Sequence, residues 1–170
     1  MNNNFTIVTI EGRDIGSEFP PYVIAEISGN HNGDINNAID LITIAKKSGA
    51  DAVKIQTYTP NTITIKSDRE EFKIKEGIWD GYTLYDLYEK AHTPWDWHKI
   101  LFAHARKIGI TLFSSFSDDT AVDFLEGFDC PAYKIGSLEI VDLPLIRKAA
   151  STGKPLLIST GMSSKEEIYE

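Results

Sequence analysis

Two lysines interrupt short apolar stretches of this 170-residue sequence, where a charged side chain is uncommon. Lys54 lies within AVKIQT, and Lys134 lies within AYKIG. A lysine in a buried strand destabilises a fold unless its charge is paired or its ammonium group reaches solvent. For either lysine alone, a structural ion pair or a snorkelling side chain explains the position as well as a ligand does. Two such lysines in two strands of one sheet favour a binding site for a phosphate or a carboxylate.

Polar residues accompany both lysines. Gln56 follows Lys54 by two positions, so the two side chains fall on the same face of a strand. Glu26 and Glu139 are the acidic counterparts. Each can be the ion-pair partner of a lysine or, in a shared pocket, an acid–base group. Hydroxyl donors stand at the ends of neighbouring apolar stretches, at Ser115, Ser137 and Ser159.

Short apolar stretches alternate with helical patterns along the chain. The stretches begin at Tyr22, Ala52, Ile110, Ala132 and Pro155. They lack regular polar–apolar alternation, which is typical of parallel strands buried on both faces. The predicted helices cover residues 34–49, 93–109, 117–127 and 142–153, and each ends at a glycine, the residue that best closes a helix. A further helix begins at Ser164, where Glu167 completes a capping box.

This alternation predicts an α/β fold with a parallel sheet and right-handed crossovers. An open doubly wound sheet and a (β/α)8 barrel of the TIM type both fit. The candidate residues are spread over all five strand ends, which favours the barrel, because a doubly wound sheet gathers its site at one switch point. A complete barrel takes about 250 residues. We therefore expect a barrel truncated to about five β/α units in residues 21–170, after a strand and turn in residues 1–20, as the amino-terminal part of a longer protein.

Residues 57–92 interrupt the alternation and are far longer than an ordinary connection. The segment is rich in aromatic side chains, which argues against disorder. We expect it to form a lid or wall over the substrate. Its aromatic residues include Tyr58, Phe72, Trp79, Tyr82, Tyr85 and Tyr88.

Composition and charge exclude several classes of protein. The net charge of −8 argues against a nucleic-acid or anionic-membrane surface, and no apolar run approaches the roughly 20 residues that cross a bilayer. A single cysteine, Cys130, fits the cytoplasm, and we expect a buried, inert thiol. The four histidines have no metal-ligand spacing. We expect His98 and His104 on the solvated side of their helix, whereas His31 follows a strand end and can reach the site.

Four motifs, taken in order, resemble the sialic acid synthase family of phosphoenolpyruvate-condensing enzymes. They are IAEISGNHNG, GADAVKIQTYTP, YKIGS and ISTGM, and the resemblance extends from about Tyr22 to the end of the chain. Each string is weak evidence alone, but their joint order is specific. The runs KSDREEFKIKEGIWD and LYDLYEKAHTPWDWH look most like the pseudaminic acid branch of this family.

The resemblance implies both an architecture and an activity. It implies a (β/α)8 barrel, a small antifreeze-like domain beyond this chain, and a homodimer when the protein is full length. It implies condensation of phosphoenolpyruvate with the aldehyde of an N-acetylated 6-deoxy hexose, which gives a nonulosonic acid and phosphate. It also implies a divalent metal, manganese or magnesium, whose histidine ligands follow the fifth strand, outside this chain. No residue here is therefore assigned to metal.

The resemblance also implies roles for individual residues. Glu26 and Glu139 match catalytic positions, and Gln56 matches a contact to the acceptor sugar. Related sequences carry SSPF or STPF in the third strand where this chain has SSFSD, so Phe116 and Ser117 receive no role. The positions that match phosphoenolpyruvate contacts are Lys54, Ser115, Lys134, Ser137 and Ser159.

Two alternatives stay open at this point. A neuraminic or legionaminic acid synthase would differ in the sugar that it accepts, and the aromatic segment would make that distinction. A protein of another class, an inactive half-barrel fragment, would bind ligands without turnover and would expose apolar sheet edges.

Overall fold

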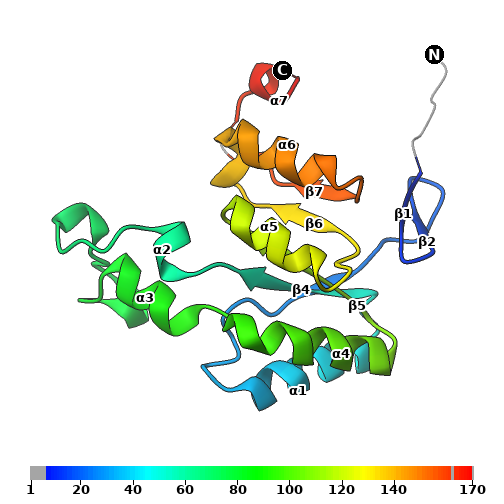
Figure 1. The fold of residues 1–170 in the computed structure, drawn as a ribbon, viewed down its shortest axis with the longest axis horizontal. Helices are drawn as coiled ribbons and strands as arrows, with labels where there is room; N and C mark the ends of the chain where they lie inside the picture. Colours follow the sequence, from blue (N-terminus) through cyan, green and yellow to red (C-terminus); the bar gives the residue numbers. More distant parts are fainter. Residues whose placement is uncertain (1–6, 162, 170) are drawn as a thin grey trace.

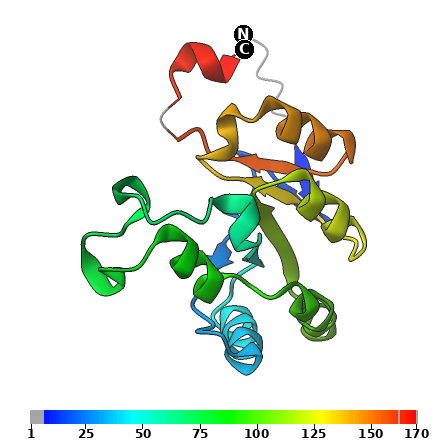
Figure 2. The same cartoon turned by 60° about the vertical axis from the view of Figure 1, so that its left-hand side comes forward.

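The structure is a computed structural model that describes residues 7–161 and 163–169. Five parallel strands form one sheet, in the order in which they occur along the chain. Because this order has no reversal, the described sheet has no topological switch point of the kind found in a doubly wound fold. The sheet curls into half of a barrel (Figure 2). Its strands are β3 (Ile24–Glu26), β4 (Ala52–Thr57), β5 (Thr111–Phe116), β6 (Tyr133–Ile135) and β7 (Leu156–Ile158).

Four helices follow one another around the outer side of the curled sheet (Figures 1 and 2). They lie where the sequence predicts helices, and a fifth, α7 (Lys165–Tyr169), has the predicted capping box between Ser164 and Glu167. The carboxylates of Asp34 and Asp142 cap their helices by accepting backbone N–H groups. The four helices are α1 (Ile35–Lys47), α4 (His98–Ile108), α5 (Asp119–Glu126) and α6 (Leu143–Ser151).

The helix predicted to begin at Thr93 begins later and has no side-chain cap. A 3₁₀ turn, Trp95–Trp97, precedes α4, and the Thr93 hydroxyl lies 3.4 Å from His31 Nε2 instead of capping the helix. The physical reason is tertiary, because the Thr93 hydroxyl interacts with the buried His31 ring and not with the backbone N–H groups at the start of the helix. The helix ends at Gly109 in the left-handed conformation, as predicted.

The hydrophobic core lies between the outer face of the sheet and these helices. Aromatic rings connect α4 to α5 and the turn after it, where Phe102 stacks on Phe128 with ring centroids 5.4 Å apart. Cys130 is buried in the same core, and burial raises the pKa of its thiol to about 12. The expected burial of this cysteine is confirmed, and a raised pKa favours the unreactive thiol over the thiolate.

A β-hairpin precedes the sheet, and its strands are β1 (Val8–Ile10) and β2 (Arg13–Ile15). Its two turn residues, Glu11 and Gly12, both have positive φ, as a tight hairpin turn requires. The Arg13 guanidinium pairs with Asp51 beside the start of β4, which ties the hairpin to the sheet. The predicted strand and turn are therefore present, although residues 1–6 lie outside the described part.

Residues 58–92, called the lid segment below, project from the site end of the sheet (Figure 1). The segment contains α2 (Pro60–Ile63), α3 (Leu84–Ala91) and two 3₁₀ turns, Glu70–Phe72 and Gly77–Trp79. Its carboxyl end packs tightly against the loop after β3. A Cβ atom at Gly29 would lie 2.8 Å from the Ala91 carbonyl oxygen.

Candidate active site

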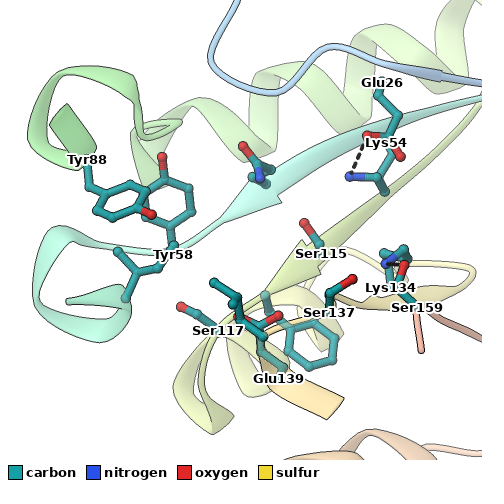
Figure 3. A pocket seen from close by; sticks show the side chains of 15 residues that line it. Glu26, Lys54, Tyr58, Tyr88, Ser115, Ser117, Lys134, Ser137, Glu139 and Ser159 are labelled. Carbon is teal, nitrogen blue, oxygen red and sulfur yellow. Dashed lines mark hydrogen bonds and ion pairs between the residues drawn. The ribbon is translucent and has the colours of Figure 1, made fainter. Parts of the chain in front are cut away.

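All eight residues singled out from the sequence line one pocket at the carboxyl ends of the strands (Figure 3). The cavity has a volume of about 350 Å³, within the range of small-molecule sites. Parallel strands bring their carboxyl ends to one edge of the sheet, which is why distant parts of the chain meet here. The eight residues are Glu26, Lys54, Gln56, Ser115, Lys134, Ser137, Glu139 and Ser159.

The register of the sheet explains why these side chains share a face. In the β3–β4 ladder, Glu26 lies opposite Lys54. Two positions further along β4, Gln56 lies opposite Ser115, which in turn lies opposite Lys134. Register partners in a sheet point to the same face, and so do residues two apart in a strand. Four strands therefore present these five side chains to the inner side of the curled sheet.

The two lysines have different partners. The Lys54 side chain is only 6% exposed, and its Nζ lies 3.4 Å from Oε2 of the half-exposed Glu26, so the structural ion pair considered for this lysine is present. The Lys134 ammonium group donates to Ser159 Oγ and to the Ile135 carbonyl oxygen, both at 2.6 Å. In the described part of the chain, no carboxylate oxygen lies within ion-pair distance of Lys134.

The surroundings of Lys134 disfavour the charged form of its side chain. Burial is the main cause that lowers the pKa of Lys134, the positive charge of Lys54 adds to it, and Glu26 and Glu139 oppose both effects. A bound anion would favour the charged form of this lysine.

Glycines shape the loops that carry the remaining polar groups. Glu139 begins a 3₁₀ turn, Glu139–Val141, and its carboxylate folds back against Gly136, where a Cβ atom would overlap Oε2. Gly161, with φ of +52°, approaches Ser137 so closely that a Cβ would lie 2.9 Å from the Ser137 Cβ. The Ser159 N–H donates to the Ile135 carbonyl oxygen at 3.1 Å, which extends the β6–β7 ladder and places Ser159 beside Lys134.

Several lining residues were not singled out as site residues in the sequence. Tyr58 and Ser117 continue the two-residue period of the predicted ones, since they follow Gln56 and Ser115 by two positions. That periodicity was sufficient to find both. Tyr88 lies on α3 of the lid segment, and no local pattern connects it to the strands. The lid segment does form a wall of the pocket, as expected.

Comparison with known proteins identifies the family. The model of the NeuB family matches residues 41–170, most of the chain. The chain belongs to the NeuB family. It is 48% identical to the pseudaminic acid synthase of Helicobacter pylori over 151 residues, which cover 89% of this chain and 44% of that protein. It is 35% identical to the N,N'-diacetyllegionaminic acid synthase of Legionella pneumophila over 168 residues, which cover 99% of this chain and 47% of that protein.

A solved structure supports the same relationship. The N-acetylneuraminic acid synthetase of Leptospira borgpetersenii serovar Hardjo-bovis matches with a TM-score of 0.83 at 25% identity, over 97% of this chain and 53% of that one. The resemblance to pseudaminic acid synthases that the motifs indicate is confirmed. This NeuB-family chain spans less than half the length of the two curated relatives.

The histidines of this NeuB-family chain contradict one expectation. His98, predicted on the solvated side of its helix, is fully buried between α4 and the sheet, with Nε2 2.8 Å from Thr57 Oγ1. His104 is half-buried and lies 2.9 Å from Thr43 Oγ1 of α1. The prediction from the helical pattern was wrong because a buried hydroxyl can hydrogen-bond to an imidazole as well as water does. His31 is also buried, edge-on to Trp97, and does not line the pocket.

The described residues also bear on metal and membrane binding. Among residues 7–161 and 163–169, no three or more His, Cys, Asp or Glu side chains are grouped closely enough to hold a metal ion. None of the helices that the structure describes has the length and apolar character needed to span a bilayer.

Proposed function

We propose that this chain supplies the phosphoenolpyruvate-binding part of a synthase. The synthase joins phosphoenolpyruvate to the aldehyde of an N-acetylated 6-deoxy hexose and yields pseudaminic acid, a nonulosonic acid, and phosphate. One observation carries the proposal: two lysines, three serines and two glutamates, contributed by five strands and the loops that follow them, line one pocket. The 48% identity to pseudaminic acid synthases supports the choice of product.

Phosphoenolpyruvate carries a phosphate and a carboxylate, and the pocket offers two cations for them. In the proposal, Lys54 and Lys134 hold these groups, and Ser115, Ser137 and Ser159 donate hydrogen bonds to their oxygens. Hydrogen bonds between ammonium groups and such anions are about twice as strong as neutral ones. Burial and the neighbouring Lys54 lower the pKa of Lys134, and a bound anion would offset both effects by favouring its charged form.

The acidic groups manage water and protons. The methylene carbon of phosphoenolpyruvate attacks the aldehyde carbon, and positive charge develops at the enol carbon. Water adds there, and the tetrahedral intermediate loses phosphate. Glu26 and Glu139 line the same pocket and are our candidates to take the proton from this water and to protonate the aldehyde oxygen. Gln56, which follows Lys54 on β4, is the candidate contact to the acceptor sugar.

A divalent metal, manganese or magnesium, enters this proposal only as a group whose ligands lie outside this chain. The described residues do not fit a metal site, because they contain no group of three or more suitable side chains. When bound, such a metal would polarise the aldehyde.

The same proposal covers the whole protein. We infer that the curled sheet is part of a TIM-type (β/α)8 barrel that further strands complete, with the antifreeze-like domain after it. We infer a cytoplasmic homodimer that takes phosphoenolpyruvate and the sugar as substrates. The net charge of −8 supports the absence of nucleic-acid partners.

A phosphate-release assay with the full-length protein tests the function. We expect turnover of phosphoenolpyruvate with an N-acetylated 6-deoxy hexose in preference to N-acetylmannosamine. Lys134→Met should raise the KM for phosphoenolpyruvate by about tenfold to a hundredfold, which corresponds to the free energy lost with one hydrogen bond to a charged group. Lys148→Met, which removes a surface ion pair with Asp123 on the outer helices, is the matched control and should change little.

The outcomes separate the alternatives. Preference for N-acetylmannosamine would favour a neuraminic acid synthase, and preference for the legionaminic acid precursor would favour that branch. Absence of turnover by the full-length protein with every acceptor would contradict the synthase activity and leave a binding role for the pocket. We expect the isolated 170-residue chain to be inactive. Turnover by that chain with manganese would contradict our proposal that residues outside it complete the active site.

A further inference from the structure

The pocket has two chemically distinct ends (Figure 3). The lysines and Ser159 lie at one end, and the rings of Tyr58 and Tyr88 lie at the other. The two rings meet edge to face, with centroids 5.6 Å apart and an interplanar angle of 83°. Ile63, the last residue of α2, also lines the pocket. One end therefore presents ammonium groups and the other presents carbon surfaces.

Strand β4 sets the spacing between these ends. Lys54, Gln56 and Tyr58 follow one another at two-residue intervals and line the same pocket. At about 3.3 Å per residue, Lys54 and Tyr58 are separated by roughly 13 Å along the strand. This separation places the tyrosines beyond the reach of a small anion held by the lysines. They are placed to contact the second substrate.

The aromatic end is held in position by packing on both sides. The Trp95 Nε1–H donates to the Tyr58 carbonyl oxygen at 3.3 Å. Helix α3, which carries Tyr88, is pressed against the loop after β3, where Gly29 leaves room for the Ala91 carbonyl. The Thr62 and Ser117 hydroxyls lie 3.2 Å apart and connect α2 to the end of β5. The aromatic surface is thus formed before a ligand arrives.

The aromatic end also stays uncharged. Burial raises the pKa of Tyr58 to about 12, so its phenol remains neutral at physiological pH. Among the residues that the structure describes, neither the Tyr58 nor the Tyr88 hydroxyl has a hydrogen-bond partner. Aromatic faces gain free energy by covering carbon-bound hydrogens and methyl groups.

We propose that Tyr58, Tyr88 and Ile63 form the specificity-determining wall of the acceptor site, which selects sugars with an apolar substituent at the end remote from the aldehyde. This inference rests on the proposed function. The aldehyde must meet the carbon nucleophile held at the lysine end, so the remote end of the sugar reaches the tyrosines. A methyl group is favoured over a hydroxymethyl group where the substituent meets the ring faces and Ile63, which offer carbon contacts and no charged partner. An apolar pocket discriminates by about tenfold to a hundredfold between such ligands.

The test compares two N-acetylated sugar aldehydes that differ only in a methyl or a hydroxymethyl group at the remote end. In the full-length protein, Tyr88→Ala should reduce the ratio of kcat/KM for the two sugars by about tenfold and raise the acceptor KM, with the KM for phosphoenolpyruvate unchanged. Tyr88→Phe keeps the ring and should preserve the ratio. Tyr85→Ala, on the same helix but outside the pocket, is the matched control and should preserve it as well.

A second variant guards against misfolding of the lid segment. Ile63→Thr keeps the branch at Cβ, shortens the side chain by one carbon, adds a hydroxyl to the wall, and should shift preference toward the hydroxymethyl sugar. An unchanged ratio in both Tyr88→Ala and Ile63→Thr would overturn the inference. So would an equal rise of both KM values in Tyr88→Ala, which would indicate a general packing role. If the wild-type protein turns over neither sugar with phosphoenolpyruvate, the proposed function itself fails.

Discussion

A single hydrogen atom in place of a methyl group decides where the Glu139 carboxylate lies. Gly136 follows β6 directly, and Glu139 folds back over it so closely that a Cβ would overlap Oε2. The backbone at Gly136 does not have a positive φ, so alanine is sterically acceptable to the chain itself. The carboxylate at the end of a flexible side chain would move instead.

Gly136→Ala should therefore impair catalysis without unfolding the protein. We expect the thermal midpoint to stay within about 2 °C of the wild type, because an alanine in an allowed conformation costs little. We expect kcat to fall toward that of Glu139→Gln. Combining the two substitutions should add no further loss, since both act on one carboxylate. Strictly additive losses in the double variant would contradict this reading of the contact.

At the scale of elements, a buried network of hydroxyl groups joins α4 to the outer face of β4 and β5. His98 Nε2 lies 2.8 Å from Thr57 Oγ1, which lies 2.6 Å from Ser114 Oγ. The Ser114 hydroxyl also donates to the Ser115 carbonyl oxygen at 2.8 Å. Thr57 and Ser114 occupy the outer face of β4 and β5, opposite to the side chains of Gln56 and Ser115. These hydrogen bonds therefore hold together β4 and β5, the two strands that carry the centre of the site.

His98 makes the stability of this arrangement dependent on pH. Burial lowers the pKa of His98 to about 4, so the folded protein holds the imidazole neutral. The unfolded chain, with an ordinary value of 6.5, binds the proton more tightly, so stability falls as the pH falls through 6.5 toward 4. From these values we expect a loss of about 2 kcal/mol in the free energy of unfolding between pH 7 and pH 5.

Urea denaturation at several pH values measures this effect. His98→Gln should flatten the dependence between pH 7 and pH 5, whereas His104→Gln, a half-buried histidine on the same helix, is the control. Equal slopes in the wild type and in His98→Gln would show that the imidazole does not titrate as expected.

At the scale of the whole molecule, the two outer strands of the sheet carry exposed apolar side chains at or beside their edges. Within residues 7–161 and 163–169, β3 and β7 each pair with one strand only. Val23 beside β3 and Ile158 in β7 are 52% and 45% exposed. An apolar cavity of about 330 Å³ lies between these strands and the hairpin. Exposed strand edges with apolar side chains promote association.

The isolated 170-residue chain should therefore associate in solution. We expect light scattering during gel filtration to give a mass well above 19.0 kDa at micromolar concentration. Introducing charges at the two edges, as Val23→Lys and Ile158→Lys, should reduce the association. A monomeric mass for the unsubstituted chain would refute the idea that these edges are adhesive.

The sequence by itself determined the order of the elements and the identity of most site residues. Both depend on local periodicity: buried parallel strands have an apolar pattern that Lys54 and Lys134 interrupt, and residues two apart share a face. Parallel strands must then bring their carboxyl ends together, so the meeting of eight polar residues followed without further information.

Only the tertiary structure decided the aromatic end of the pocket and the burial of His98. Tyr88 reaches the site because α3 packs against the loop after β3, a contact between segments far apart in the sequence. His98 is buried because Thr57 and Ser114 satisfy it from another element. A local sequence pattern predicts which face of an element a residue occupies. It does not predict which residue from a distant segment will contact that side chain, because this contact depends on how the elements pack once the sheet has curled.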